Sequence, residues 1–161
     1  MSTPDRDTDT TVIAETVTRV VFPLILLTAI ALLFRGHNLP GGGFIAGVLT
    51  AAAFALLYVI YGLDFVGDDL LDRSGTSTTA AGPAIVADYR LAFATGLALA
   101  IVGGLAAIAL GQPFLTQAVV FLEHLPLYEE LEVASAFVFD LGVYLVVVGA
   151  LLTILAVVGA E

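Results

Sequence analysis

Four long apolar blocks dominate this sequence and constrain its fold more than any other feature. They cover residues 18–34, 44–63, 91–110 and 133–158. A membrane-spanning helix needs roughly 20 apolar residues, so each block has about the length required to cross a bilayer. Backbone amides and carbonyls find no water inside a bilayer, which favours helices that satisfy these groups internally. The sequence therefore predicts an all-α membrane protein with four transmembrane helices in a small bundle.

The composition agrees with a multi-pass location in the cell membrane. Hydrophobic residues make up 60% of the chain, charged residues make up only 12%, and the mean hydropathy is +1.06. A chain this short and apolar cannot hide its hydrophobic surface in a water-soluble core. Its length allows one compact bundle rather than two domains.

The charge balance is strongly acidic. The chain has 15 acidic residues, five arginines, no lysine and a net charge of −10. Nucleic-acid binding is excluded because phosphate contacts need clustered cations. An acidic surface without lysine is typical of proteins bathed in high salt, so the composition suggests a halophile. The absence of cysteine excludes disulfides, thiol catalysis and thiolate metal ligands.

The segments outside the four blocks differ in character. Residues 1–17 form an acidic amino-terminal tail that lacks the features of a signal peptide. Residues 64–90 are rich in Gly, Ser and Thr and are predicted to form a mobile surface loop. The stretch 114–125 is too apolar for a free loop and too short to span, so we expect it at the membrane interface or against a partner. Pro23 lies near the start of the first block, where a missing amide is least disruptive.

The arginines predict the orientation of the chain. Arg6, Arg19, Arg73 and Arg90 fall on one side of the predicted membrane domain, and Arg35 falls on the other. Basic residues are enriched on the cytoplasmic side of membrane proteins. Both termini are therefore predicted to face the cytoplasm.

A glycine-rich motif between the first two blocks is the most specific local feature. It cannot continue a helix, and its glycines permit positive φ and close backbone approach. Two interpretations stay open: the motif lines a polar pocket at membrane depth, or it is a turn that lets a helix pack closely. Its structural residues are Gly36, Asn38, Pro40, Gly41, Gly42 and Gly43.

His37 lies inside this motif. A histidine changes its charge near neutral pH, so His37 is a candidate proton relay; the alternative is a hydrogen-bonded turn residue at the interface. His124 is the only other histidine, and no ligand pattern joins the two. No metal site is predicted.

Asp140 is the one carboxylate well inside an apolar block. Counted from residue 133, it lies about 10 Å below the start of the helix. A charge at that depth must be paired, wetted or protonated, so Asp140 is a candidate for an ion path or an intersubunit pair. Tyr144 follows at i+4 on the same face. The alternative is that the helix begins later and Asp140 is an interfacial cap.

Small residues predict where helices touch in lipid. They indicate specific neighbours for the third and fourth helices, either within this chain or in another. The spaced pairs are Gly43 with Gly47, Gly96 with Gly103, and Gly142 with Gly149.

The sequence offers little catalytic equipment. No nucleophile–base pair, dinucleotide fingerprint or metal cluster is recognisable, so we predict neither catalytic residues nor a cofactor, and no enzyme. Four helices without an obvious internal repeat also fall short of the paired halves usual in secondary carriers.

Two stretches together resemble a known family. Residues 34–47 and 139–150, with the step 111–116, are similar to the B subunit of Mrp-type (also called Mnh-type) multisubunit sodium/proton antiporters. The resemblance covers about residues 15–158. It implies a small subunit of a hetero-oligomeric membrane complex that exchanges cytoplasmic sodium for external protons. Similar modules occur in membrane-bound hydrogenases and complex-I-like assemblies, which is the alternative parent complex.

Within such a complex the chain has two possible roles. In one, Asp140, His37 and Tyr144 border a cation or proton path. In the other, the glycine faces dock helices and the chain contributes no ion ligand. A free-standing channel is a weaker third possibility, because polar lining residues are scarce.

Overall fold

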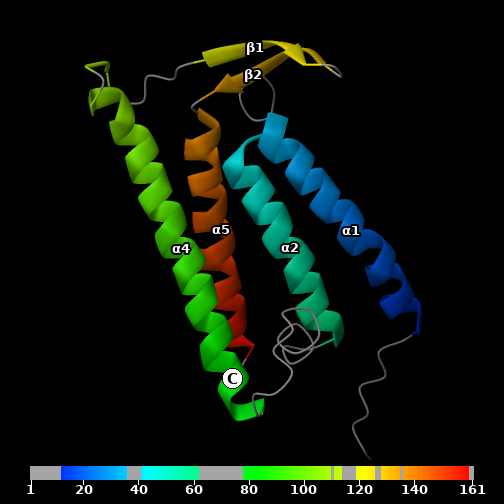
Figure 1. Ribbon diagram of the computed structural model, residues 1–161. Helices are drawn as coiled ribbons and strands as arrows, with labels where there is room; N and C mark the ends of the chain where they lie inside the picture. The colour runs from blue at the N-terminus through cyan, green and yellow to red at the C-terminus, as the bar shows by residue number, and fades with distance from the viewer. Residues whose placement is uncertain are drawn as a thin grey trace, which may run out of the picture.

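The computed structural model describes residues 12–35, 41–61, 78–109, 111–113, 119–125, 128–134 and 136–159. Within this part of the chain, Figure 1 shows four long helices and one β-hairpin. The helices are α1 (Val12–Arg35), α2 (Gly43–Tyr61), α4 (Thr78–Ala109) and α5 (Ala136–Val158). The strands are β1 (Val119–Leu125) and β2 (Tyr128–Ala134).

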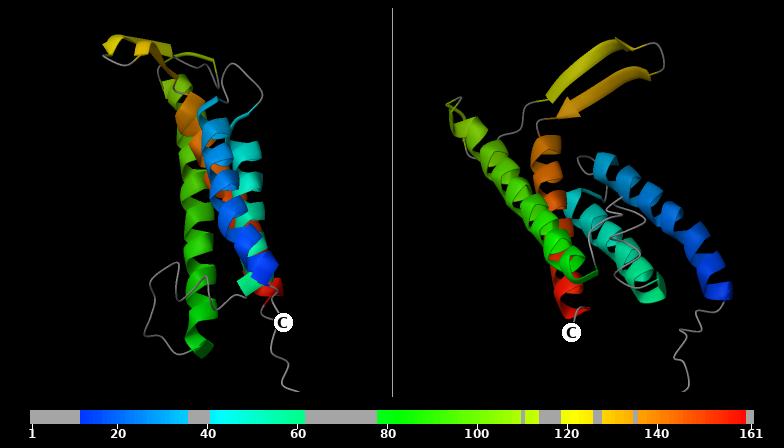
Figure 2. Two further views of the ribbon diagram at one scale, coloured as in Figure 1. Left: turned by 90° about the vertical axis from the view of Figure 1, so that its right-hand side faces the viewer. Right: turned by 60° about the horizontal axis from the view of Figure 1, so that its bottom comes forward.

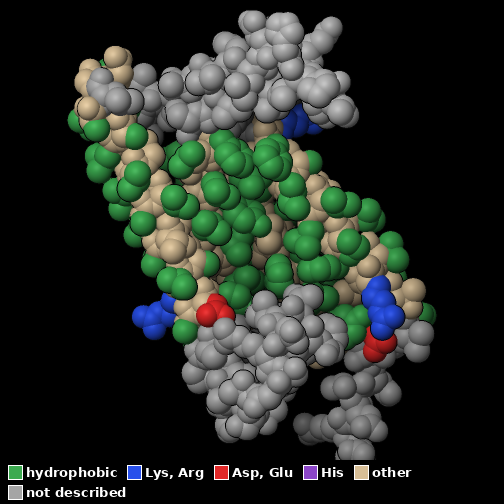
Figure 3. All heavy atoms as spheres, viewed as in Figure 1, with side chains coloured by type: hydrophobic (Ala, Val, Ile, Leu, Met, Phe, Trp, Pro, Cys, Tyr) green, Lys and Arg blue, Asp and Glu red, His purple; other side chains and the backbone are tan. Residues whose placement is uncertain are grey.

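Each helix contains a segment long and apolar enough to cross a membrane. The four segments are Ile13–Arg35, Gly43–Tyr61, Val86–Ala109 and Ala136–Val158. Figure 3 shows the resulting belt of apolar side chains, with basic side chains at both margins and acidic side chains at the margin where α1 begins. The predicted membrane fold with four spanning helices is confirmed.

The helices lie side by side in the order α4, α5, α2, α1, as Figures 1 and 2 show. The last helix of the chain is therefore an inner one, with α4 on one flank and α2 on the other. α1 packs mainly on α2, where Phe22 meets Phe54 edge to face with ring centroids 5.6 Å apart. α1 reaches α5 only marginally, through the stacked rings of Phe34 and Phe137 at a centroid distance of 5.3 Å.

α1 begins earlier than the apolar block suggests. It starts at Val12, with Glu15 in its first turn, where the positive end of the helix dipole favours an acidic side chain. The predicted tail through residue 17 is thus partly helical. The expectation that Pro23 sits in the first turn is wrong, because Pro23 lies inside the helix. A proline there removes the amide that would bond the carbonyl of Arg19, a loss that packed neighbours can offset in a membrane helix.

α4 also begins early. The prediction of a mobile loop is wrong for residues 78–90, because this segment is helical. Alanines at 80, 81 and 84 are strong helix formers and extend the helix beyond the spanning segment. Residues 62–77 lie outside the described part of the chain.

The connection from α4 to α5 contains a β-hairpin that the apolar pattern does not predict. β1 and β2 pair antiparallel, with Val119 opposite Ala134 and Leu125 opposite Tyr128. Figure 1 shows the hairpin beyond the end of the helices where α1 finishes and α5 starts. Since residue 133 belongs to β2, α5 begins at Ala136, three residues later than the apolar block implies.

Candidate functional site

The reversal from α1 to α2 is closed by backbone hydrogen bonds at Gly42. Its amide donates to the carbonyl of Leu32 over 3.0 Å, and its carbonyl accepts from the amide of Ala46 over 3.1 Å. Gly42 has a φ of 99°, in the left-handed region that side chains rarely adopt. The positive φ expected from the glycine-rich motif occurs at this residue.

The start of α2 lies directly on the backbone of α5. A Cβ on Gly43 would overlap the carbonyl oxygen of Asp140, and one on Gly47 would come within 2.9 Å of the Cβ of Val147. Both glycines are buried. Glycine is therefore required here because only a residue without a side chain permits this approach between helices.

Asp140 lies where α2 begins. Because α5 starts at Ala136, Asp140 is its fifth residue, about 6 Å along the helix rather than the predicted 10 Å. Its half-buried carboxylate faces Gly42, such that a Cβ on this glycine would lie 3.6 Å from Oδ1. The amides in the first turn of α2 have no partners within that helix, and the positive end of the helix dipole favours an anion at this place.

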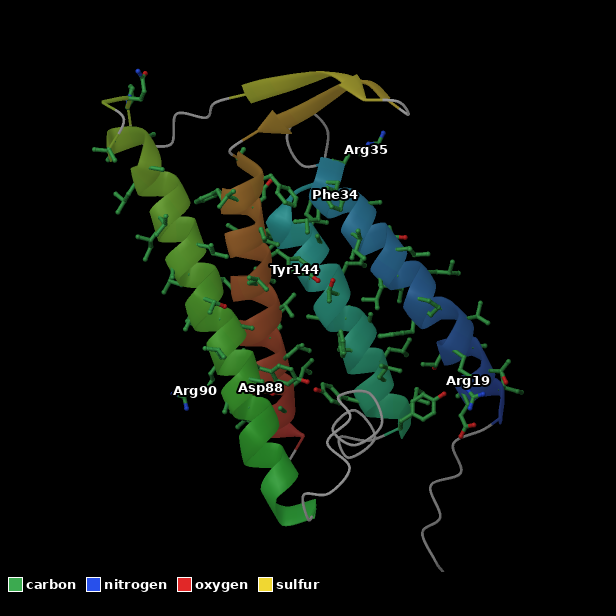
Figure 4. The ribbon with its side chains drawn as sticks, in the orientation of Figure 1. Arg19, Phe34, Arg35, Asp88, Arg90 and Tyr144 are labelled. Carbon is green, nitrogen blue, oxygen red and sulfur yellow. The ribbon has the colours of Figure 1, made fainter. Side chains whose placement is uncertain are left out.

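Tyr144 connects this region to the interior. Its hydroxyl lies 3.1 Å from the Oγ1 of Thr50 on α2, and either group can donate. Figure 4 shows Tyr144 on α5, at the contact with α2. Thr50 is only 4% exposed. The structure thus places Asp140 and Tyr144 of α5, together with Thr50 of α2, at the contact between these two helices.

Thr50 is a site residue that the sequence analysis missed. The available signal is its position seven residues after Gly43, which puts a polar residue on the same face of α2 as the glycines.

A second hydroxyl pair, also missed, joins α2 to α4. The hydroxyls of Tyr58 and Tyr89 are hydrogen-bonded to each other. Tyr89 is buried in a cluster with Ala51, Leu152 and Ala156. Tyrosines in an apolar segment usually indicate the membrane interface. The sequence pattern therefore gives no sign that Tyr89 is buried between helices.

The small residues of α4 and α5 face each other within this chain. A Cβ on Gly142 would lie 2.6 Å from the amide nitrogen of Ala100, and one on Gly149 would lie 2.6 Å from the carbonyl oxygen of Tyr89. Gly96 fits equally closely against α5, whereas Gly103 has ordinary van der Waals space beside Phe139. These contacts answer the open question of whether the neighbours belong to the same chain.

Several predicted site residues fall outside the described part of the chain: Gly36, His37, Asn38 and Pro40. Among the residues that the structure does describe, no group of three or more His, Cys, Asp or Glu side chains could hold a metal ion. Charged side chains lie at the membrane margins. Figure 4 shows Arg19, Asp88 and Arg90 at one end of the helices and Arg35 at the other.

The fold and this contact define a small four-helix membrane protein in which glycines bring α5 close to both α2 and α4. A family model described as "Domain related to MnhB subunit of Na+/H+ antiporter" matches residues 13–153. The chain belongs to this family, as the resemblance in the sequence indicated.

Individual relatives agree over nearly their full length. The Na(+)/H(+) antiporter B subunit of Alkalihalophilus pseudofirmus is 37% identical over 150 residues, which cover 93% of this chain and 93% of that protein. The Na(+)/H(+) antiporter B subunit of Bacillus subtilis is 37% identical over 149 residues, covering 92% of this chain and 93% of that protein.

A solved structure shows the same fold. A chain in the structure of the Mrp complex from Dietzia sp. DQ12-45-1b matches with a TM-score of 0.69 and 26% sequence identity. The match covers 99% of this chain and 15% of that chain. This protein therefore corresponds to one part of a much longer polypeptide in that complex.

Proposed function

We propose that this chain is the B subunit of a multisubunit Na+/H+ antiporter and works as part of a hetero-oligomeric complex in the cell membrane. The observation that carries the proposal is the 37% identity, over 93% of both chains, to a protein named as that component. The names of the relatives favour an antiporter over a hydrogenase-type complex. They also favour a role in transport over catalysis.

The arrangement of helices supports a role in assembly. In the row of helices, α1 and α4 are the outer members, and both carry exposed apolar side chains along the spanning segments. Such side chains suit contact with lipid or with the helices of other subunits. Examples are Leu24 and Leu27 on α1, and Leu97 and Ile101 on α4.

Asp140 and Tyr144 are proposed to border an ion path at the contact of α2 with α5. The carboxylate lies at the start of α2, and the buried Tyr144–Thr50 pair continues the line of polar groups toward the membrane interior. His37, in the connection that precedes α2, is proposed to share this role. The scaffold interpretation predicts instead that none of these side chains affects transport once the complex is assembled.

Both termini are proposed to face the cytoplasm. Arg19 and Arg90 lie at the end of the helices where α1 begins and α5 ends, and Arg35 lies at the opposite end (Figure 4). A reporter active only in the cytoplasm, fused to Glu161, should be active. A silent fusion with good expression would reverse the topology.

The direct test is to tag this chain in its host and purify it in a mild detergent. We expect several other membrane subunits to co-purify. Everted vesicles from cells without the gene should lose sodium-dependent proton movement, and the gene supplied in trans should restore it. Purification of the chain alone, together with unchanged antiport in the deletion strain, would refute the proposed function.

A further inference from the structure

Buried hydroxyl groups in this protein are concentrated on α2 and its neighbours. Thr50 pairs with Tyr144 of α5, and Tyr58 pairs with Tyr89 of α4. Thr50 is 4% exposed and Tyr89 is 9% exposed, so each pair contains one buried residue. Polar groups in the interior of a membrane protein are costly and commonly mark a path for ions or protons.

The geometry of Thr50 differs from that of the other helical threonines whose bonds are described. Thr18, Thr28, Thr95 and Thr153 each donate to a carbonyl of their own helix. The hydroxyl of Thr50 lies instead against a hydroxyl of another helix. A threonine in lipid normally satisfies itself on its own helix, so this outward orientation indicates a role between helices.

The Tyr58–Tyr89 pair joins two helices that have little other contact. α2 and α4 lie on opposite flanks of α5, and the two tyrosines pack with Leu152 and Ala156 of that helix. Two hydroxyls carry two hydrogens, and their mutual bond uses only one. Among the described residues the second hydrogen has no acceptor, so the pair retains the capacity to bond a water molecule or pass on a proton.

The two pairs lie at different depths along α2. Tyr89 is flanked in the chain by the exposed Asp88 and Arg90, which places the Tyr58–Tyr89 pair beside the water at that margin. Thr50 and Tyr58 are about 12 Å apart along α2. The section between them is apolar and includes Ala51 and Phe54 of α2.

We propose that α2 carries a proton path with two hydroxyl stations, Tyr58–Tyr89 and Thr50–Tyr144, which leads to Asp140 at the opposite margin. The inference rests on the proposed function. It adds the Tyr58–Tyr89 pair as a second proton-transfer site and an apolar, water-free section between the two pairs. Hydrophobic constrictions gate channels by wetting and dewetting, so a proton passes the dry section only when water enters it.

The transfer leaves both tyrosines neutral. A proton arriving from water forms an O–H bond at the oxygen of Tyr89, while the original hydrogen of that hydroxyl passes to the oxygen of Tyr58. The hydrogen of Tyr58 leaves in the same concerted movement to water in the dry section, so the transfer occurs only while that section is wetted and neither oxygen holds two hydrogens. One O–H bond breaks for each one that forms, so no phenolate has to be stabilised in the membrane.

The experiment uses the full complex with Tyr58→Phe or Tyr89→Phe, because phenylalanine keeps the ring and removes the hydroxyl. Sodium-dependent proton movement is measured in everted vesicles and normalised to assembled complex. We expect a loss on the order of tenfold or more, the scale at which a positioned proton-transfer group contributes. Thr50→Val, which leaves the contact with α4 untouched, should show a loss of the same kind.

Two matched variants serve as controls. Tyr61→Phe makes the same change on α2 at a hydroxyl that bonds the carbonyl of Glu15, and Thr153→Val mirrors Thr50→Val at a hydroxyl that bonds Gly149. Both should retain normal transport per complex. Normal transport in the test variants would overturn the proposal. A loss of assembly with unchanged transport per complex would also overturn it, because the tyrosine pair would then only hold α2 and α4 together. If neither tyrosine variant assembles, normal transport in Thr50→Val overturns it.

These outcomes are separate from failure of the proposed function. If the chain is not part of an antiporter, deleting the wild-type gene leaves antiport unchanged. If only the proton path is wrong, deletion abolishes antiport while the hydroxyl variants sustain it.

Discussion

The two flanks of α5 make helix contacts of different kinds. Toward α4, the contact uses glycines from both helices, and the groups nearest to Gly142 and Gly149 are backbone atoms. Toward α2, the glycines come from α2 alone, and they face Asp140 and Tyr144 of α5. Both contacts bring backbones together, but only the second places a carboxylate beside the glycines.

This difference separates two requirements on the same helix. Lipid supplies no hydrophobic driving force between helices, so close packing of small residues must hold them together. At its glycines, the α4 contact meets that requirement with backbone and apolar atoms. The α2 contact meets it with Gly43 and Gly47, and in addition keeps a carboxylate and two hydroxyls in place. Assembly and ion movement should therefore respond differently to changes on the two flanks.

The largest effect on assembly is expected for Gly43→Ala. The added methyl group would overlap the carbonyl oxygen of Asp140, and neither backbone can yield as a flexible side chain could. The loss should reach or exceed the roughly 1–3 kcal/mol typical of an overpacked core. The amount of complex recovered in mild detergent measures it. Normal recovery would show that α2 and α5 do not pack this closely.

Gly149→Ala tests the other flank. Its methyl group would lie 2.6 Å from the carbonyl oxygen of Tyr89, so α4 and α5 must separate and the recovered complex should fall. Gly103→Ala is the matched control, because its methyl group would meet Phe139 at an ordinary 3.6 Å. Because the displaced α4 carries Tyr89, transport per assembled complex should fall in Gly149→Ala and stay normal in Gly103→Ala. Normal transport per assembled complex in Gly149→Ala would show that the α4 contact is structural only.

Gly42→Val should have a smaller effect that comes from the backbone. A Cβ there has ordinary space, 3.6 Å from the carboxylate of Asp140, but a φ of 99° strains a β-branched residue by about 1 kcal/mol or more. We expect less assembled complex before any change in ion selectivity. Gly42→Asn should be milder, since asparagine tolerates positive φ better than valine does. Equal recovery of both variants would remove the backbone explanation.

The sequence predicts the features that depend on periodic or compositional signals. Apolar blocks near the length of a bilayer predict four spans, and glycines seven apart predict the faces where α4 and α5 meet. Helix ends are harder to predict, because a helix can continue beyond the hydrocarbon where no apolar signal marks it. Residues 78–90 show this, since alanines extend α4 through a segment whose threonines, glycine and proline resemble a loop.

The features that were missed depend on contacts between distant segments. The alternation of Glu130, Leu131, Glu132 and Val133 has the period of a strand, but the apolar block obscured it. Tyr58 and Tyr89 are 31 residues apart, and no local pattern shows that their hydroxyls meet. For Asp140 the sequence identified the residue but overestimated its depth, because the start of α5 depends on where the hairpin ends.

Asp140→Asn should have the smallest effect on assembly and therefore gives the sharpest test of the polar flank. Asparagine keeps the size and hydrogen-bonding capacity of the side chain at the start of α2, so the recovered complex should be close to normal. If Asp140 borders the ion path, sodium-dependent proton movement per complex should fall or shift in its pH dependence, because the titratable charge is gone.

If Asp140 instead pairs with a cation of another subunit, assembly should fail at a cost of about 3–5 kcal/mol, since the cation is left buried and alone. Normal transport across pH with normal assembly would eliminate both roles and leave Asp140 as an interfacial cap for α2. The shallow position of the carboxylate against Gly42 makes assembly without full transport the expected result, because the amino-terminal end of a helix favours an acidic side chain without a partner from another chain.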